Sequence, residues 1–212
     1  MQDDTRRYRL GPALFYLGAA YARNAAIHRA VWNELVDLAR DVGLTAVIAV
    51  PWEDHHLILN VHRGGPPGVE VAVGGRVPLD AGAWGKVYYA WTGLTPHKGP
   101  GGRTADDSYR DMIAAARDHG YATDAGEFTP GSGGVASAIT SEHGFEGVAA
   151  LVGTVNRLSE LGFVQLGERL GAVASRASYA LGDHARIKLL GVDEGPGVTR
   201  SRLRQEPSRV RR

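Results

Sequence analysis

The segment from Asp80 to Ala83 has the residue types of an anion-binding helix start. A helix beginning near Asp80–Gly82 directs unpaired backbone N–H groups toward whatever lies before it, and carboxylates bind well there. Ala81, Gly82 and Ala83 are small, so a ligand can approach that backbone closely. Asp80 is also a candidate N-cap of this helix, and we favour this role over ligand contact. The segment therefore predicts a carboxylate site.

Trp84 and Asp124 each have two open interpretations, and Ser132 has one plain interpretation. Trp84 shares a helical face with Tyr88 and Trp91, so core packing and ligand contact both remain open. Asp124 follows Gly-Tyr-Ala-Thr, where an Asx turn or a surface acid is the alternative to a pocket role. Ser132 is most simply a residue of a glycine-rich loop.

Other polar patterns do not assemble into a catalytic or metal site. Gly131–Ala136 fits G-x-G-x-x-A, but Thr-Pro precedes it and a strand-like run follows, which argues against a dinucleotide site. His55 and His56 point to opposite faces of a strand, and His56 and His62 are too far apart to share a metal. We expect surface or capping histidines. There is no G-x-S-x-G or H-E-x-x-H motif, so we expect no enzyme, no metal and no cofactor.

Length, charge and composition limit the class of protein. The 212 residues suit one domain of about 150–200 residues plus a tail, and the absence of Cys excludes disulfides. The net charge is +1, but residues 198–212 hold six Arg and one Glu, so residues 1–197 are mildly acidic. A mildly acidic body argues against a DNA-binding face, which is usually basic. No apolar run approaches a membrane span, and the polar N-terminus is no secretory signal, so we expect a cytoplasmic protein.

Hydrophobic periodicity predicts helices at both ends of a set of strands. Residues 12–42 are predicted to be helical, broken near Arg23–Ala26 and ended by Gly43. A hairpin follows over Thr45–Val50 and His56–Val61. Alternating apolar residues predict a short strand over Val69–Val73. The two apolar stripes of the first segment are Leu14, Leu17 and Tyr21, then Ile27, Val31, Leu35, Leu38 and Val42.

The second half of the chain is also predicted to contain helices and strands. A helix capped by Thr104 and Asp107 ends at Gly120, two strands follow over Gly134–Thr140 and Phe145–Val152, and a long helix begins after Ser159. Tight turns imply antiparallel strands, and the terminal helices must cover one face of the sheet. The fold class is therefore α+β.

Four segments in order resemble the effector-binding half of IclR-type bacterial transcription regulators over about residues 6–182. They correspond to the wing and linker helix, the loop and helix around Gly-Lys, the acidic turn with Thr-Pro-Gly, and the penultimate strand with the start of the last helix. These are YRLGPALFYLG (Tyr8–Gly18), GGRVPLDAGAWGKVYYAW (Gly74–Trp91), HGYATDAGEFTPGSGGVASAI (His119–Ile139) and GFEGVAALVGTVNRLSE (Gly144–Glu160).

The resemblance implies a GAF-like antiparallel sheet flanked by helices and preceded by a linker helix. It divides the chain into residues 1–10 as a remnant of a winged-helix wing, 11–24 as the linker helix, 25–191 as the effector-binding domain and 192–212 as a disordered basic tail. Most of the family's DNA-binding winged helix is then missing from this chain. The implied partners are a small-molecule effector and a homodimer or homotetramer, with DNA contacted only through the missing domain and no membrane.

By the family pattern, the effector pocket lies under residues 77–86 and against the two late strands. The residues that match its lining are Val69, Val77, Ala83, Trp84, Asp124, Ser132, Gly134, Ala150 and Val152.

This chain departs from the family at several of these positions. Relatives commonly have His at position 80 and Ser or Thr at position 82, and those that bind small oxo-acids have hydroxyl side chains where this chain has Ala150 and Val152. We therefore expect a less polar, more aromatic acid, stacked on Trp84 with its carboxylate at the helix start. The alternatives are an enzyme on a GAF-like scaffold and a purely structural oligomerisation module.

Overall fold

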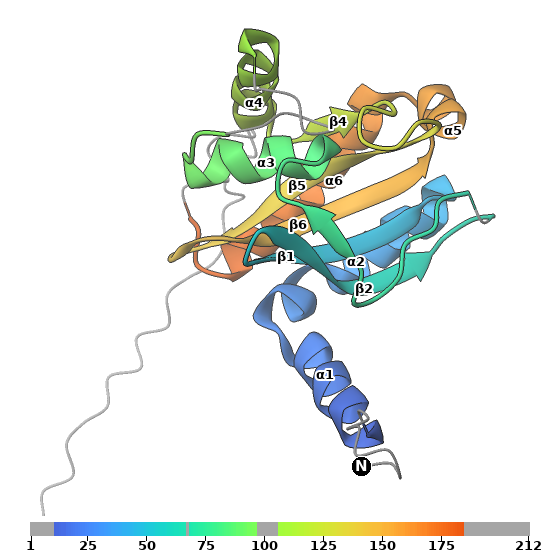
Figure 1. Cartoon of the computed structure of the whole chain (residues 1–212), viewed down its shortest axis with the longest axis vertical. Helices are drawn as coiled ribbons and strands as arrows, with labels where there is room; N and C mark the ends of the chain where they lie inside the picture. Colours follow the sequence, from blue (N-terminus) through green and yellow to red (C-terminus); the bar gives the residue numbers. More distant parts are fainter. Residues whose placement is uncertain (1–10, 67, 97–105, 185–212) are drawn as a thin grey trace, which may run out of the picture.

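The computed structural model describes residues 11–66, 68–96 and 106–184, which form an antiparallel sheet with helices on both faces (Figure 1). The strands are β1 (Thr45–Trp52), β2 (His55–Arg63), β3 (Arg76–Pro78), β4 (Ala122–Asp124), β5 (Ser132–Ser141) and β6 (Gly144–Thr154). The helices are α1 (Pro12–Asn24), α2 (Ala26–Val42), α3 (Gly82–Thr92), α4 (Asp107–His119), α5 (Val155–Leu161) and α6 (Phe163–Ala180). The predicted α+β class is confirmed.

The first two helices meet at a single extended residue. Ala25 has φ −54° and ψ 134°, so α1 ends and α2 begins within the predicted break. Gly43 ends α2 in the left-handed region at φ 70°, also as predicted. The apolar stripe of α2 is buried, whereas Leu14, Leu17 and Tyr21 of α1 are exposed. Figure 1 shows α1 projecting away from the sheet, so only α2 anchors the N-terminal segment.

The sheet has the strand order β3-β2-β1-β6-β5-β4, and every neighbouring pair is antiparallel. Both predicted hairpins, β1–β2 and β5–β6, are confirmed. The predicted strand over Val69–Val73 is wrong, because residues 68–75 form an irregular loop and the short strand β3 follows it. Main-chain bonds of Gly74 and Gly75 to Ile58 fold this loop back on β2, and no strand ladder forms along it.

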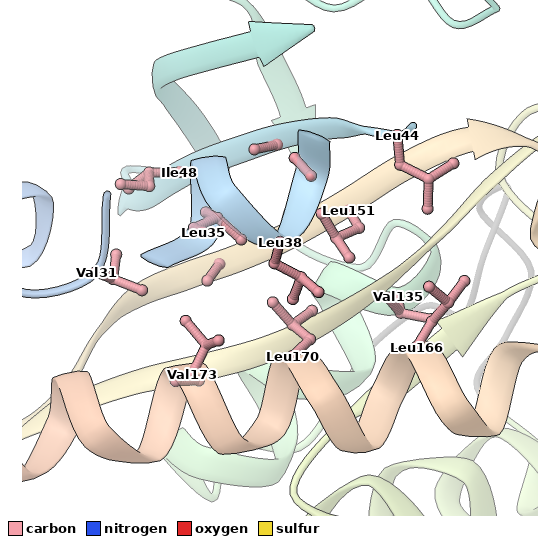
Figure 2. Packing of buried hydrophobic residues seen from close by; sticks show 14 of the residues in the cluster. Val31, Leu35, Leu38, Leu44, Ile48, Val135, Leu151, Leu166, Leu170 and Val173 are labelled. Atoms are coloured by element: carbon pink, nitrogen blue, oxygen red, sulfur yellow. The ribbon is translucent and has the colours of Figure 1, made fainter. Parts of the chain in front are cut away.

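One face of the sheet is covered by α2 and α6, which confirms that the terminal helices share a face. Leu35, Leu151 and Leu170 are fully buried between these helices and the strands (Figure 2). Large aliphatic side chains fill this layer, and their burial is the main stabilising contribution to the fold.

The other face is covered by α3, with α4 beside it, and its packed side chains are much smaller. Seven alanines belong to this layer: Ala49, Ala83, Ala116, Ala122, Ala136, Ala138 and Ala150. Small side chains under a helix leave space between the helix and the sheet.

Two predicted helix starts are wrong by a few residues. The N-cap of α4 is Asp106, whose carboxylate accepts a hydrogen bond from the Tyr109 N–H at 2.9 Å; Thr104 lies outside the described residues. The last segment contains two helices, because Gly162 at φ 82° separates α5 from α6 at Phe163. The predicted wing remnant (1–10) and basic tail (192–212) also lie outside the described residues. None of the described helices combines the length and apolarity needed to cross a bilayer.

His56 is fully buried beneath α3, so the expectation of a surface or capping histidine is wrong for this residue. Its ring meets the rings of Trp84 and Tyr88 edge to face, at centroid distances of 5.9 and 5.7 Å. Within the described residues neither ring nitrogen has a hydrogen-bond partner. Burial lowers the pKa of His56 to about 4, although the Leu79 backbone acts in the opposite direction.

This pKa predicts a loss of stability in mild acid. The unfolded chain takes up the proton near pH 6.5 and the folded chain only near pH 4, so stability falls as pH drops through that window, by about 3 kcal/mol in total. His56→Leu removes the titrating ring, so its unfolding free energy, measured in urea at pH 7.0 and 4.5, should fall less than that of the parent.

His143→Leu is the matched control, because His143 is exposed and its removal should leave the pH dependence of stability unchanged. Equal pH dependence in His56→Leu and the parent would contradict the burial of a neutral His56.

Candidate effector cavity

A cavity of about 580 Å³ opens between the start of α3 and the alanine-rich face of the sheet. Such a volume lies within the range of small-molecule sites in proteins. The loop over residues 68–76, the start of α3, the turn after β4, and strands β5 and β6 form its walls.

Every predicted site residue except Ala150 lines this cavity. Ala150 is fully buried in the layer below it and does not reach the surface of the cavity. The residues that line it as predicted are Val69, Val77, Ala83, Trp84, Asp124, Ser132, Gly134 and Val152.

The start of α3 lacks any side-chain cap. Its N-cap is Ala81, so the expectation that Asp80 caps the helix is wrong. The Ala81 N–H bonds to the Pro78 carbonyl, but the N–H groups of the first helical turn have no partner within the described residues. Ala83 and Trp84 of that turn line the cavity. The unpaired N–H groups and the helix dipole together make this end of the cavity favourable for an anion.

Asp124 is both an Asx-turn residue and a cavity residue, so the two interpretations from the sequence hold together. Its Oδ1 accepts hydrogen bonds from the N–H groups of Gly126 at 2.9 Å and Glu127 at 2.7 Å. Its Oδ2 has no hydrogen-bond partner among the described residues and lies against Gly82, where an added Cβ would overlap it. Gly82 has φ 49°, so both conformation and space require glycine there. This oxygen remains available to a donor in the cavity.

An ion pair between the buried Lys86 and the partly exposed Glu127, which sequence reasoning missed, links α3 to the turn that carries Asp124. The Lys86 ammonium, on α3, donates to the Thr123 carbonyl at 2.8 Å and to Glu127 Oε1 at 2.7 Å. Its side chain is 4% exposed and that of Glu127 33% exposed. These bonds join α3 to the residues on either side of Asp124. The Gly-Lys pair was visible in the sequence, but no pattern indicated which acid it meets.

Trp84 is 7% exposed and lines the cavity, so it packs in the core and also forms part of the cavity wall. Thr129 and Ser132 supply hydroxyls at one side, while Ile58, Gly134 and Val152 make the floor apolar. Phe128, 40% exposed, stands on the loop at the rim. Sequence reasoning missed the rim residues because they come from irregular loops without periodicity.

Charged side chains are few around the cavity. Asp124 is buried, whereas Glu70 and Arg76 are exposed on the loop and on β3. The one buried charge among the described lining residues is therefore negative. The cavity suits a mostly apolar ligand that offers a hydrogen-bond donor to Asp124 and an acceptor or anion to the helix start.

Three possible metal ligands lie elsewhere, at the turn between β1 and β2. Ligand atoms of Glu53, Asp54 and His55 come within 4.8 Å of one another. The His55 ring bonds to Asp54 Oδ1 at 2.9 Å, and this bond lowers the pKa of Asp54. Glu53 and Asp54 are exposed, so the cluster has the form of an ordinary polar turn.

Comparison with known proteins agrees with this architecture. The family model "Bacterial transcriptional regulator IclR C-terminal" matches residues 19–179. No curated protein sequence matches the chain. Among solved structures, the IclR protein of Thermotoga maritima has a TM-score of 0.70 at 21% identity, covering 86% of this chain and 79% of the other.

Two further structures have the same fold. An IclR regulator of Alicyclobacillus acidocaldarius has a TM-score of 0.66 at 24% identity, covering 85% of this chain and 78% of that one. An IclR homolog of Microbacterium hydrocarbonoxydans, complexed with 4-hydroxybenzoate, has a TM-score of 0.66 at 22% identity with the same two coverages. The family model spans most of the chain, and the fold agrees with it. The chain therefore belongs to the IclR family of bacterial transcriptional regulators, as a C-terminal effector-binding domain.

Proposed function

We propose that the cavity binds a small carboxylic acid with an aromatic body, and that this acid is the signal the regulator senses. The observation that carries the proposal is the uncapped start of α3, where Ala81, Ala83 and Trp84 line the cavity. A carboxylate placed there completes the hydrogen bonding of the helix end. The 4-hydroxybenzoate bound by the Microbacterium hydrocarbonoxydans homolog supports an acid of this class.

The rest of the cavity supports an aromatic body and a polar group next to the acid. The exposed part of the Trp84 ring offers an apolar surface for stacking. Asp124 Oδ2 is free to accept a hydrogen bond from a hydroxyl or amine of the ligand. Val152 offers no hydroxyl to the cavity, which disfavours two- or three-carbon oxo-acids that depend on a donor from this strand.

In the proposed regulator, residues 11–24 are the linker helix and residues 25–191 the effector-binding domain. The protein acts in the cytoplasm as a homodimer or homotetramer, and ligand binding biases the arrangement of subunits and hence operator affinity. The linking element is α1, whose apolar residues Leu14, Leu17 and Tyr21 are exposed. We propose a sensor rather than an enzyme, because the family model that matches residues 19–179 describes transcriptional regulators.

Ligand preference tests the proposal directly. At 100-fold its dissociation constant, 4-hydroxybenzoate should add about 2.7 kcal/mol of stability, raising the melting temperature by roughly 5–10 °C. Glyoxylate at the same concentration should have little effect. Thermal-shift measurements compare the two acids on the parent and on Trp84→Leu, which keeps an apolar wall but removes the aromatic face and should weaken 4-hydroxybenzoate binding. Stabilisation by glyoxylate alone would overturn the assignment of an aromatic acid.

Gly82→Ala tests whether the ligand depends on the geometry at the start of α3. The new Cβ overlaps Asp124 Oδ2 and places a non-glycine residue at φ 49°, so both the carboxylate and the helix start must move. We expect 4-hydroxybenzoate affinity, measured by calorimetry, to fall at least about ten-fold, equivalent to about 1.4 kcal/mol.

Gly93→Ala is the matched control, since Gly93 at the other end of α3 also has a positive φ, 68°, but open space around its Cβ. It should lose stability through strain while keeping ligand affinity. Equal affinity in both variants would show that the ligand does not bind at the start of α3.

A further inference from the structure

A second cavity of about 370 Å³ lies next to the first, on the same face of the sheet. Gly68, Val69 and Val152 line both cavities, so the two share a wall. The second cavity ends at the start of β1, the end of β6 and the first turn of α5. Of the site residues predicted from the sequence, Val69 and Val152 line both cavities and none lines the second cavity alone.

The shared wall is thin. Gly68 has no side chain, and a Cβ placed there would come within 3.1 Å of Thr154 Cγ2. Among the described residues of the loop, Val69 is the one whose side chain lines both cavities, and Val152 of β6 lines both as well. A ligand that shifts or passes this valine therefore has access to both spaces.

The charges differ between the two cavities. The first contains the buried Asp124 carboxylate, whereas Arg157 is the one charged side chain among the described residues that line the second. Arg157 donates to the Val42 carbonyl at 3.2 Å and to Glu160 Oε2 at 3.2 Å, which hold the guanidinium at the end of the cavity. With five N–H donors, a guanidinium held by two bonds still has donors for a carboxylate.

We infer that the natural effector is an elongated dicarboxylic acid that spans both cavities, with its second carboxylate at Arg157. This inference rests on the proposed function and extends it from a single-ring acid to a longer class of ligand. Asp124 of β4 pairs with Gly134 of β5, which pairs with Val152 of β6. The backbones of Asp124 and Val152 are therefore about 10 Å apart, two strand spacings. Arg157 follows Val152 in the chain, in the first turn of α5. A benzoate alone fills only the first part of this path.

A pair of probes of equal length separates the second carboxylate from the extra length. 4-(4-Carboxybutyl)benzoate and 4-pentylbenzoate differ only in the group at the far end. In calorimetry, Arg157→Gln should weaken the dicarboxylate at least about ten-fold and leave 4-pentylbenzoate and 4-hydroxybenzoate unchanged. Arg157→Lys keeps a cation and should restore part of the loss.

Arg169→Gln is the matched control. The Arg169 side chain is 49% exposed and ion-paired, against 46% for Arg157, but it lies on α6 away from both cavities. It should change none of the three affinities. Melting temperatures of all variants confirm that each is folded.

The outcomes separate the two proposals. If the dicarboxylate binds no differently to Arg157→Gln and to the parent, or if only 4-hydroxybenzoate binds, the elongated effector is wrong and the proposed aromatic-acid site survives. If none of the three acids binds to the parent, the proposed function fails as well.

Discussion

The buried contact between Lys86 and the segment after β4 is the interaction on which the candidate site depends. It joins the helix that forms one wall of the cavity to the turn that carries Asp124. Removing one partner of such a pair leaves a charge without compensation, at a cost of several kcal/mol when buried. The Asx turn of Asp124 and the glycine at position 82 add local constraints. Together they fix a carboxylate beside an uncapped helix start without closing the space in front of it.

The cavity exists because the two faces of the sheet are packed differently. The α2–α6 face is filled with leucine, isoleucine and valine, whereas alanines predominate on the α3 face. Gly134, which lines the cavity, has no side chain at all, and a Cβ there would come within 2.7 Å of the Leu151 carbonyl oxygen. The stability of the domain therefore comes mainly from the face without a ligand site, which leaves the other face free to keep an open volume.

The elements with strong periodicity were predictable from the sequence, and those defined by single contacts were not. The stripe of α2, its left-handed end at Gly43 and both hairpins follow from local pattern and turn chemistry. Residues 69–73 alternate like a strand, but two glycines and the backbone of Ile58 fold them into a loop. No local pattern distinguishes Asp106 from Thr104 as a cap, or shows that Gly162 divides the last helix.

The candidate site was predictable to a similar extent. The resemblance identified eight of the lining residues, because strand register and the start of α3 are properties of the shared fold. Ala150 was predicted to line the cavity but is fully buried below it. The burial of His56 and the pairing of Lys86 with Glu127 depend on side chains that are distant in sequence. Residue spacing within a helix or strand cannot predict such contacts.

The sheet lies between the first cavity and the helix α2 that α1 contacts. The cavity lies on the α3 face, while α1 contacts α2, which packs on the opposite face. Strand β6 connects the two, because Val152 lines the cavity and Gly147 lies under the first turn of α2, where an added Cβ would come within 2.8 Å of Ile27 Cδ1. A glycine at that point brings the helix close to the strand, so a small shift of β6 acts directly on the helix next to α1. If a ligand in the cavity acts on α1, the packing of Gly147 against Ile27 makes a displacement of β6 a physical path for that coupling.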